Sequence, residues 1–188
     1  MSLRYKYIAL LLSVGSLWPA AARAQEMYVC VWTNPERTMR RIFPTAKDYK
    51  TITRRITAEQ RVRIERRLGS PLLPGQRDQF QYYEMTDASG TPLGHIIAAS
   101  QKGGFGAIEF VFGIDVERRI VGMYIQRARE RDTAFRNRDF LERFIGRTLA
   151  DLDNPESALL SPVTVGTKAV FLGLRKELIA FDELHRRE

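Results

Sequence analysis

Residues 107–115 read Ala-Ile-Glu-Phe-Val-Phe-Gly-Ile-Asp, and residues 120–125 read Ile-Val-Gly-Met-Tyr-Ile. Both runs are rich in β-branched and aromatic side chains, which pack well on the pleated surface of a sheet. A polar turn at residues 115–118 separates them, so the sequence predicts an antiparallel hairpin of strands 107–114 and 120–127. So short a connection leaves no room for a crossover helix, which argues against a parallel sheet.

The same pattern continues upstream of this hairpin. Residues 80–86 and 93–99 are expected to be two more strands, joined by an Asp-Ala-Ser-Gly turn at residues 87–90. Weaker strand patterns cover residues 49–56 and residues 28–32. Turn signals at short, even spacing favour an antiparallel meander, so the predicted fold class is α+β, a twisted antiparallel sheet with packed helices.

Helix signals flank the strands. A Thr-Ala-Glu-Gln capping box at residues 57–60 opens a helix, and an Asn-Pro pair opens a shorter one at residues 34–36. Apolar residues at three- and four-residue steps predict helices over residues 137–144 and 165–184, which should cover the sheet. Residues 148–160 are expected to form a loop.

The N-terminus has the three parts of a secretory signal. Residues 1–7 are basic and contain no acid, residues 8–17 are almost entirely apolar, and residues 22–24 read Ala-Arg-Ala. The apolar run is about half of the ~20 residues that span a bilayer, so a retained anchor is the weaker alternative. We expect a signal peptide at residues 1–24, cleavage after Ala24, a periplasmic location, and one domain from residue 25 to residue 188.

The net charge of +8 raises the question of an acidic partner. The basic residues lie among acids along the chain, as on the solvated face of a helix, and export also argues against nucleic acid. The charge is compatible with an acidic partner protein or with peripheral contact to anionic lipid.

Few residues offer chemistry of their own. Cys30 is the only cysteine, so no intramolecular disulfide is possible, and we expect it to be a small buried hydrophobe. His95 is expected to be buried and hydrogen-bonded, and His185 to lie in a frayed C-terminal tail. Neither has metal-ligand neighbours. No Gly-x-Ser-x-Gly element is present, so no catalytic residue and no metal ligand is predicted.

Phosphate binding has a better candidate at the start of the last predicted helix. Residues 161–168 read Ser-Pro-Val-Thr-Val-Gly-Thr-Lys. A helix N-terminus offers unpaired backbone N–H groups and a positive dipole end, to which Ser161, Thr164 and Thr167 would add hydroxyl groups. The alternative is ordinary helix capping by Ser161 or Thr164, with Pro162 at an early helical position.

The order of these segments resembles the FMN-binding domain family, which includes the periplasm-facing flavin subunits of the Rnf and sodium-translocating NADH:quinone reductase complexes. The resemblance covers roughly residues 93–180. The segments that carry it are residues 103–115, 119–125, 129–131, 140–147 and 161–170.

The resemblance implies a bound FMN and an electron carrier that serves a redox protein or a membrane electron-transport complex. It implies that Thr164 and Ser161 hold the flavin phosphate, covalently or not, beside Gly166 and Thr167. It also implies which residues lie near the flavin ring, namely Glu130, Lys102, Gly103 and Phe105.

The chain departs from the family's attachment motif. Ala158 stands where the family has Asp, Pro162-Val163 replace Gly-Ala, and Gly166 stands where Ser or Thr is usual. Pro162 has no N–H to offer a phosphate. Two functions therefore stay open, an FMN electron carrier and a flavin-free partner subunit of a redox complex. The sequence favours an electron carrier or a redox-complex subunit over a stand-alone enzyme.

Overall fold

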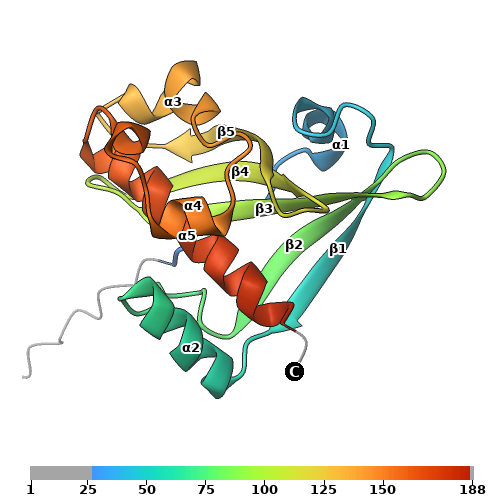
Figure 1. The fold of residues 1–188 in the computed structure, drawn as a ribbon, viewed down its shortest axis with the longest axis horizontal. Coiled ribbons are helices and arrows are strands. Elements are labelled where there is room, and N and C mark those ends of the chain that lie inside the picture. The colour runs from blue at the N-terminus through green and yellow to red at the C-terminus, as the bar shows by residue number, and fades with distance from the viewer. Residues whose placement is uncertain (1–26, 187–188) are drawn as a thin grey trace, which may run out of the picture.

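A computed structural model describes residues 27–186, so the predicted signal peptide lies outside the described residues. The five strands form one antiparallel sheet in sequence order, which confirms the predicted α+β fold (Figure 1). The elements are α1 (Pro35–Thr38), η1 (Met39–Arg41), β1 (Asp48–Arg55), α2 (Ala58–Leu68), β2 (Gln79–Thr86), β3 (Pro92–Lys102), β4 (Ala107–Asp115), β5 (Ile120–Ala128), η2 (Ala134–Arg136), α3 (Arg138–Glu142), α4 (Leu149–Asp153), η3 (Ser157–Leu160) and α5 (Val165–Leu184).

β4 is buried along both of its faces, which explains its nearly continuous apolar sequence. Phe110 and Phe112 belong to the larger core under α5, whereas Val111 between them belongs to a second core on the opposite face. Val111 therefore does not share a core with Ile114 and Ile120, because successive side chains of a strand point to opposite faces.

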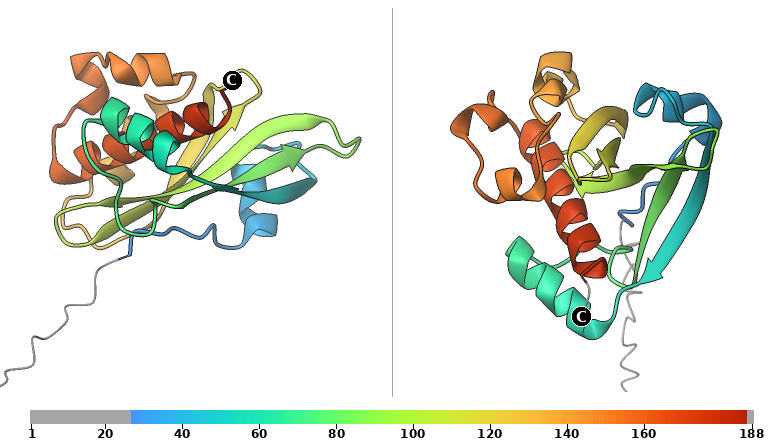
Figure 2. Two further views of the ribbon diagram at one scale, coloured as in Figure 1. Left: turned by 90° about the horizontal axis from the view of Figure 1, so that it is seen from below. Right: turned by 45° about the vertical axis from the view of Figure 1, so that its right-hand side comes forward.

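The larger core lies between the sheet and α5. The helix is buried along most of its length, with Leu174 and Leu178 among its core residues. α2 packs beside α5 and contributes Ile64, which is fully buried. Figures 1 and 2 show α5 lying across the sheet with α2 alongside it.

The segment before β1 covers the opposite face of the sheet, as the left view of Figure 2 shows for α1. Gly113 and Gly122 are paired in register, and a Cβ at Gly113 would lie 2.3 Å from Cγ2 of Ile42. The two glycines thus allow Ile42 to approach the sheet closely. This segment and the sheet bury the second core.

Three predicted elements need correction. Residues 28–32 are not a strand. The ring of Trp32 packs against those of Tyr49 and Tyr83. Its Nε1 donates to the Tyr124 hydroxyl at 3.0 Å. Residues 148–160 contain α4 and η3, and a capping box between Thr148 and Asp151 opens α4. Pro162 precedes the N-cap of α5 and does not lie in its first turn.

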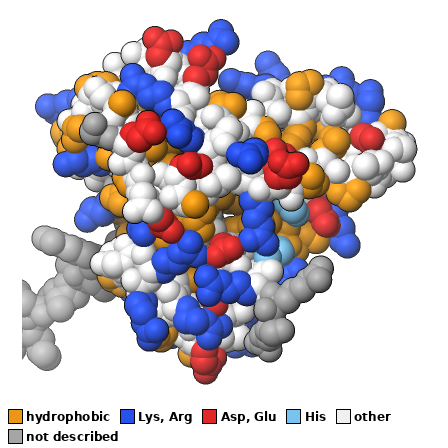
Figure 3. All heavy atoms as spheres, in the orientation of Figure 1, with side chains coloured by type: hydrophobic (Ala, Val, Ile, Leu, Met, Phe, Trp, Pro, Cys, Tyr) orange, Lys and Arg blue, Asp and Glu red, His pale blue; other side chains and the backbone are white. Residues whose placement is uncertain are grey.

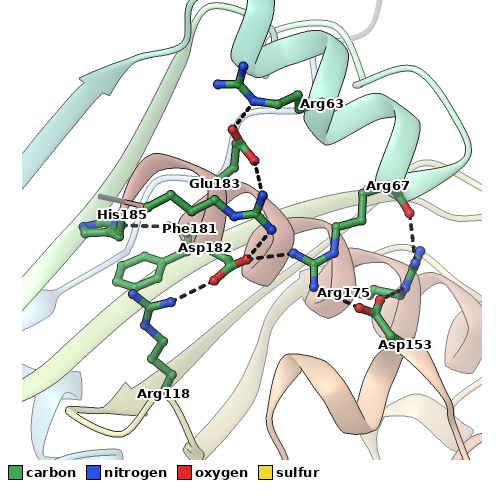
Figure 4. A network of polar contacts seen from close by, with 10 residues as sticks. Arg63, Arg67, Arg118, Asp153, Arg175, Phe181, Asp182, Glu183 and His185 are labelled. Atoms are coloured by element: carbon green, nitrogen blue, oxygen red, sulfur yellow. Dashed lines mark hydrogen bonds and ion pairs between the residues drawn. The ribbon is translucent and has the colours of Figure 1, made fainter. Parts of the chain in front are cut away.

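Charged side chains form ion pairs between α5 and the elements around it (Figure 4). On the face seen in Figure 3, Lys and Arg lie among Asp and Glu, which accords with the mixed charge pattern of the sequence. The ion pairs join Arg63 to Glu183, Arg67 to Asp153 and Asp182, Arg118 to Asp182, and Arg175 to Asp153.

Candidate functional site

Two threonines cap the N-terminus of α5. Thr164 is the N-cap, and its hydroxyl accepts a hydrogen bond from the N–H of Thr167 at 3.1 Å. The hydroxyl of Thr167 accepts from the N–H of Thr164 at 2.8 Å and donates to the carbonyl of Pro162 at 2.8 Å. This reciprocal pattern is a capping box, so Thr164 and not Ser161 caps the helix.

Asp132 lies at the same helix end, although the sequence does not single it out. Its Oδ1 accepts from the N–H of Ala134 at 2.9 Å, while its Oδ2 is buried with no hydrogen bond of ordinary geometry among the described residues. Burial opposes its ionisation, but the Thr164 hydroxyl and the N–H groups of Ala134 and Gly166 outweigh that effect and lower the pKa of Asp132. The helix N-terminus therefore faces a carboxylate that belongs to the chain itself.

Phe135 fills the remaining space beside the first turn of α5. The ring is fully buried, and a Cβ at Gly166 would lie 2.2 Å from its Cδ1 and 2.8 Å from Oδ2 of Asp132. Gly166 is thus required by the close approach of the loop that carries Asp132 and Phe135. The same contact leaves little room at this end of the helix for a further group.

The residues predicted to lie near a flavin ring meet at the tip of the β3–β4 hairpin. Oε1 of Glu130 accepts from the N–H of Phe105 at 2.8 Å, and a Cβ at Gly103 would lie 2.3 Å from that same oxygen. Gly104 faces Cγ1 of Val165 across 3.4 Å, measured from its ideal Cβ position. The hairpin tip, the loop after β5 and the start of α5 therefore form one surface.

Two of the predicted site residues lie at the margin of this surface. Lys102 is exposed at the end of β3, where it pairs in register with Ala107. Ser161 is exposed, and its carbonyl accepts from the guanidinium of Arg143. Within residues 27–186 its hydroxyl makes no hydrogen bond, so Ser161 does not join Thr164 and Thr167 at the helix end.

Several of the donors that a phosphate would need are already used at this site. The N–H of Thr167 donates to the Thr164 hydroxyl, the Thr167 hydroxyl donates to the carbonyl of Pro162, and Pro162 has no N–H. A second anion beside Asp132 would meet a like charge in a partly buried place, where screening is weak. As arranged, these residues do not fit the phosphate of FMN.

Two other titratable side chains, Cys30 and His185, differ from the sequence-based prediction in their burial or their order. Cys30 is only partly buried, and burial with the charges of Glu109 and Glu177 raises the pKa of its thiol to about 12, which makes it a poor nucleophile. His185 is not frayed, because Nδ1 donates to the carbonyl of Phe181 at 2.7 Å and Nε2 lies 3.0 Å from the Tyr82 hydroxyl.

His95 is partly buried rather than fully enclosed. Its ring packs against those of Tyr82, Phe181 and His185, with centroids 5.3, 5.0 and 6.2 Å away. In the part of the chain that the structure describes, no group of three or more His, Cys, Asp or Glu side chains is placed to hold a metal ion.

The sequence gives no direct signal for Asp132 and Phe135, because the contact with Gly166 joins segments about thirty residues apart.

Between residues 27 and 186, no helix is long and apolar enough to cross a membrane. Comparison of the chain with protein-family models and with curated proteins finds no match in either set.

Proposed function

We propose that this chain is a flavin-free docking subunit, built like an FMN-binding domain, that serves an exported or membrane-bound redox complex. The observation that carries the proposal is the carboxylate of Asp132 at the start of α5, where a flavoprotein of this kind would need a phosphate. The redox context rests on the order of the sequence segments that resemble the family.

The surface around this helix end supports docking. Phe105, Val163 and Val165 are 56%, 61% and 58% exposed, although each is a large apolar side chain. The guanidinium of Arg131 lies 4.8 Å from the centre of the Phe105 ring. Aromatic and arginine side chains of this kind often anchor protein interfaces. The hairpin tip and the start of α5 are therefore the docking surface that we assign to the partner.

The first test is the flavin content of the native protein. The chain, expressed in its native host with its N-terminal segment, should give a dark band under ultraviolet light on a denaturing gel and no flavin absorption spectrum. Added FMN should not bind at micromolar concentration, whereas Asp132→Ala should bind it measurably more tightly, because the repelling carboxylate is gone. Asp139→Ala, an exposed acid on α3, is the matched control.

The second test concerns the docking surface. A photo-crosslinking residue at Phe105 should form an adduct with a redox protein in host membranes, and Val163→Ser should reduce the yield. The same crosslinker at Val62, an exposed apolar residue of α2, should give no such adduct. Adducts with unrelated proteins alone would count against a redox partner.

The competing function is an FMN electron carrier. It is favoured by one observation, the meeting of Glu130, Gly103 and Phe105 with the Thr164 end of α5. Stoichiometric flavin in the native protein that disappears in Thr164→Ala but not in Thr57→Ala, the N-cap of α2, would establish the carrier and overturn the docking subunit.

A further inference from the structure

The outer edge of β5 is open. β5 stands last in the strand order and pairs only with β4. Beyond that pairing, Ile120 exchanges backbone hydrogen bonds with residues 146 and 147, and Arg136 donates to the carbonyl of Ala128 at 2.7 Å. Among the described residues no other element bonds to the edge between these two points. A row of unpaired N–H and C=O groups therefore faces outward.

A cavity of about 550 Å³ lies along this edge. Five consecutive residues of β5, numbers 121–125, line it. Because successive side chains alternate between the two faces of a sheet, a cavity over one face would touch every second residue. The unbroken run indicates that the cavity follows the backbone edge.

The walls of the cavity are basic and apolar. Arg41 from η1 lies on one side, its guanidinium 4.2 Å from the centre of the Tyr124 ring. Arg136 and Arg138 line it from the α3 side, which faces α1 across β5 in Figure 1. Glu142 is the one acid in the lining, and Arg138 pairs with it at 2.6 Å. The lining thus carries three positive charges against one negative charge.

Apolar side chains complete the groove. Leu141 is partly buried, and Ile145 is 42% exposed although it is a large hydrophobic residue. An occupant that fits must therefore offer backbone groups to β5, negative charge to the arginines and apolar side chains to the α3 wall.

We propose that the edge of β5 binds an extended acidic segment of a partner protein as an added strand. Its backbone pairs with residues 121–125, its acidic side chains meet Arg41 and Arg138, and alternate apolar side chains contact Leu141 and Ile145. This inference does not depend on the flavin content of the α5 site.

Two other occupants fit less well. A small anion would satisfy the arginines but leave the strand edge unpaired. A second copy of this chain, paired edge to edge about a two-fold axis, would bring one set of arginines against the same set in its partner, which is repulsive.

The test begins with displayed peptides of about nine residues, the length of β5. One library alternates Asp or Glu with Val, Ile, Thr or Phe, and the other replaces each acid by Lys or Arg. Selection on the full domain should enrich only the acidic library. A bound acidic peptide should slow hydrogen exchange at residues 121–125. Failure to enrich any acidic sequence, or protection elsewhere only, overturns the proposal.

Variants separate strand addition from simple charge attraction. Arg138→Glu should weaken the selected peptide about three- to tenfold, since a rim ion pair is lost and a like charge gained. Arg55→Glu makes the same charge change on β1, the opposite edge strand, and should leave affinity unchanged. A peptide with Pro at alternate positions keeps its charge but loses backbone donors and should not bind. Equal binding of that peptide, or a peptide-free dimer through β5, overturns the proposal.

Discussion

A buried ion pair of neighbouring residues lies in the middle of α5. Nζ of Lys176 donates to the carbonyl of Ser100 at 2.7 Å and to Oε1 of Gln76 at 2.8 Å, and lies 3.2 Å from the Glu177 carboxylate. Burial lowers the pKa of Lys176 and raises that of Glu177, and each charge counteracts the effect on the other. Loss of one member alone therefore leaves the other as a buried charge without its counter-ion.

We expect Lys176→Met to lower the free energy of unfolding by about 3–5 kcal/mol, because it leaves the carboxylate of Glu177 buried without a cation. The double variant Lys176→Met/Glu177→Leu should cost less than the single variant, since no unpaired charge remains. Urea unfolding followed by circular dichroism measures both. A double variant as unstable as the single one would mean that the lost hydrogen bonds of Lys176, not the orphaned charge, set the cost.

Among the elements, those with local end signals could be predicted and those that depend on distant contacts could not. Thr57 caps its helix as the sequence predicts, because a capping box spans only four residues. For α5 the sequence leaves Ser161 and Thr164 open as the cap, and the structure selects Thr164. Thr148 carries the same signal, but α4 is too short for its periodicity to be recognised. The apolar run around Trp32 reads as a strand, yet Trp32 is buried by docking on Tyr124.

The contacts of the candidate site also include local ones, which follow from the sequence, and distant ones, which do not. The meeting of Thr164 with Thr167 follows from their spacing, whereas the approach of Asp132 to Gly166 depends on how the loop after β5 folds back onto α5. The residue types of that loop carry no local periodicity that would reveal the contact. A resemblance in segment order placed Glu130 near the site but assigned no role to Asp132.

We expect Gly166→Ala to destabilise the domain by roughly 1–3 kcal/mol, because the added methyl group overlaps Phe135. This cost exceeds the gain of up to about 1 kcal/mol from the higher helix propensity of Ala. Thermal unfolding measures it, with Val165→Ala, an exposed neighbour, as the control. A neutral or stabilising Gly166→Ala would mean that the loop moves away and that the helix end has room for a ligand.

At the scale of the whole molecule, the two histidines of the chain lie where α5 meets the sheet. The His185 ring stacks on Phe181 with centroids 4.0 Å apart, and Tyr82 packs against both histidines. Burial is the main cause that lowers the pKa of each histidine, and each lies near positive charge, such as Arg118. Both therefore favour the neutral form in the folded state.

The sign of the pH dependence follows from those directions. Because the folded-state pKa values lie below the unfolded value of about 6.5, the unfolded chain binds more protons in that window and stability falls as the pH decreases. We expect the free energy of unfolding to drop between about pH 7.5 and 5.5, and the drop to shrink in His95→Phe/His185→Gln. Urea unfolding at each pH measures it. An unchanged slope in the double variant would assign the effect to carboxylates instead.

The order of the strands also sets the order in which the chain can fold. Each strand pairs with the next one along the chain. Short turns join β2 to β3, β3 to β4 and β4 to β5, so these three hairpins depend on contacts that are local in the sequence. α5 follows the whole sheet in the sequence and is the element that covers Phe110 and Phe112. A nascent chain that has emerged only to Ala128 holds paired strands with one apolar face bare. The apolar face of the sheet therefore most needs protection by a chaperone in the interval before α5 has been synthesised.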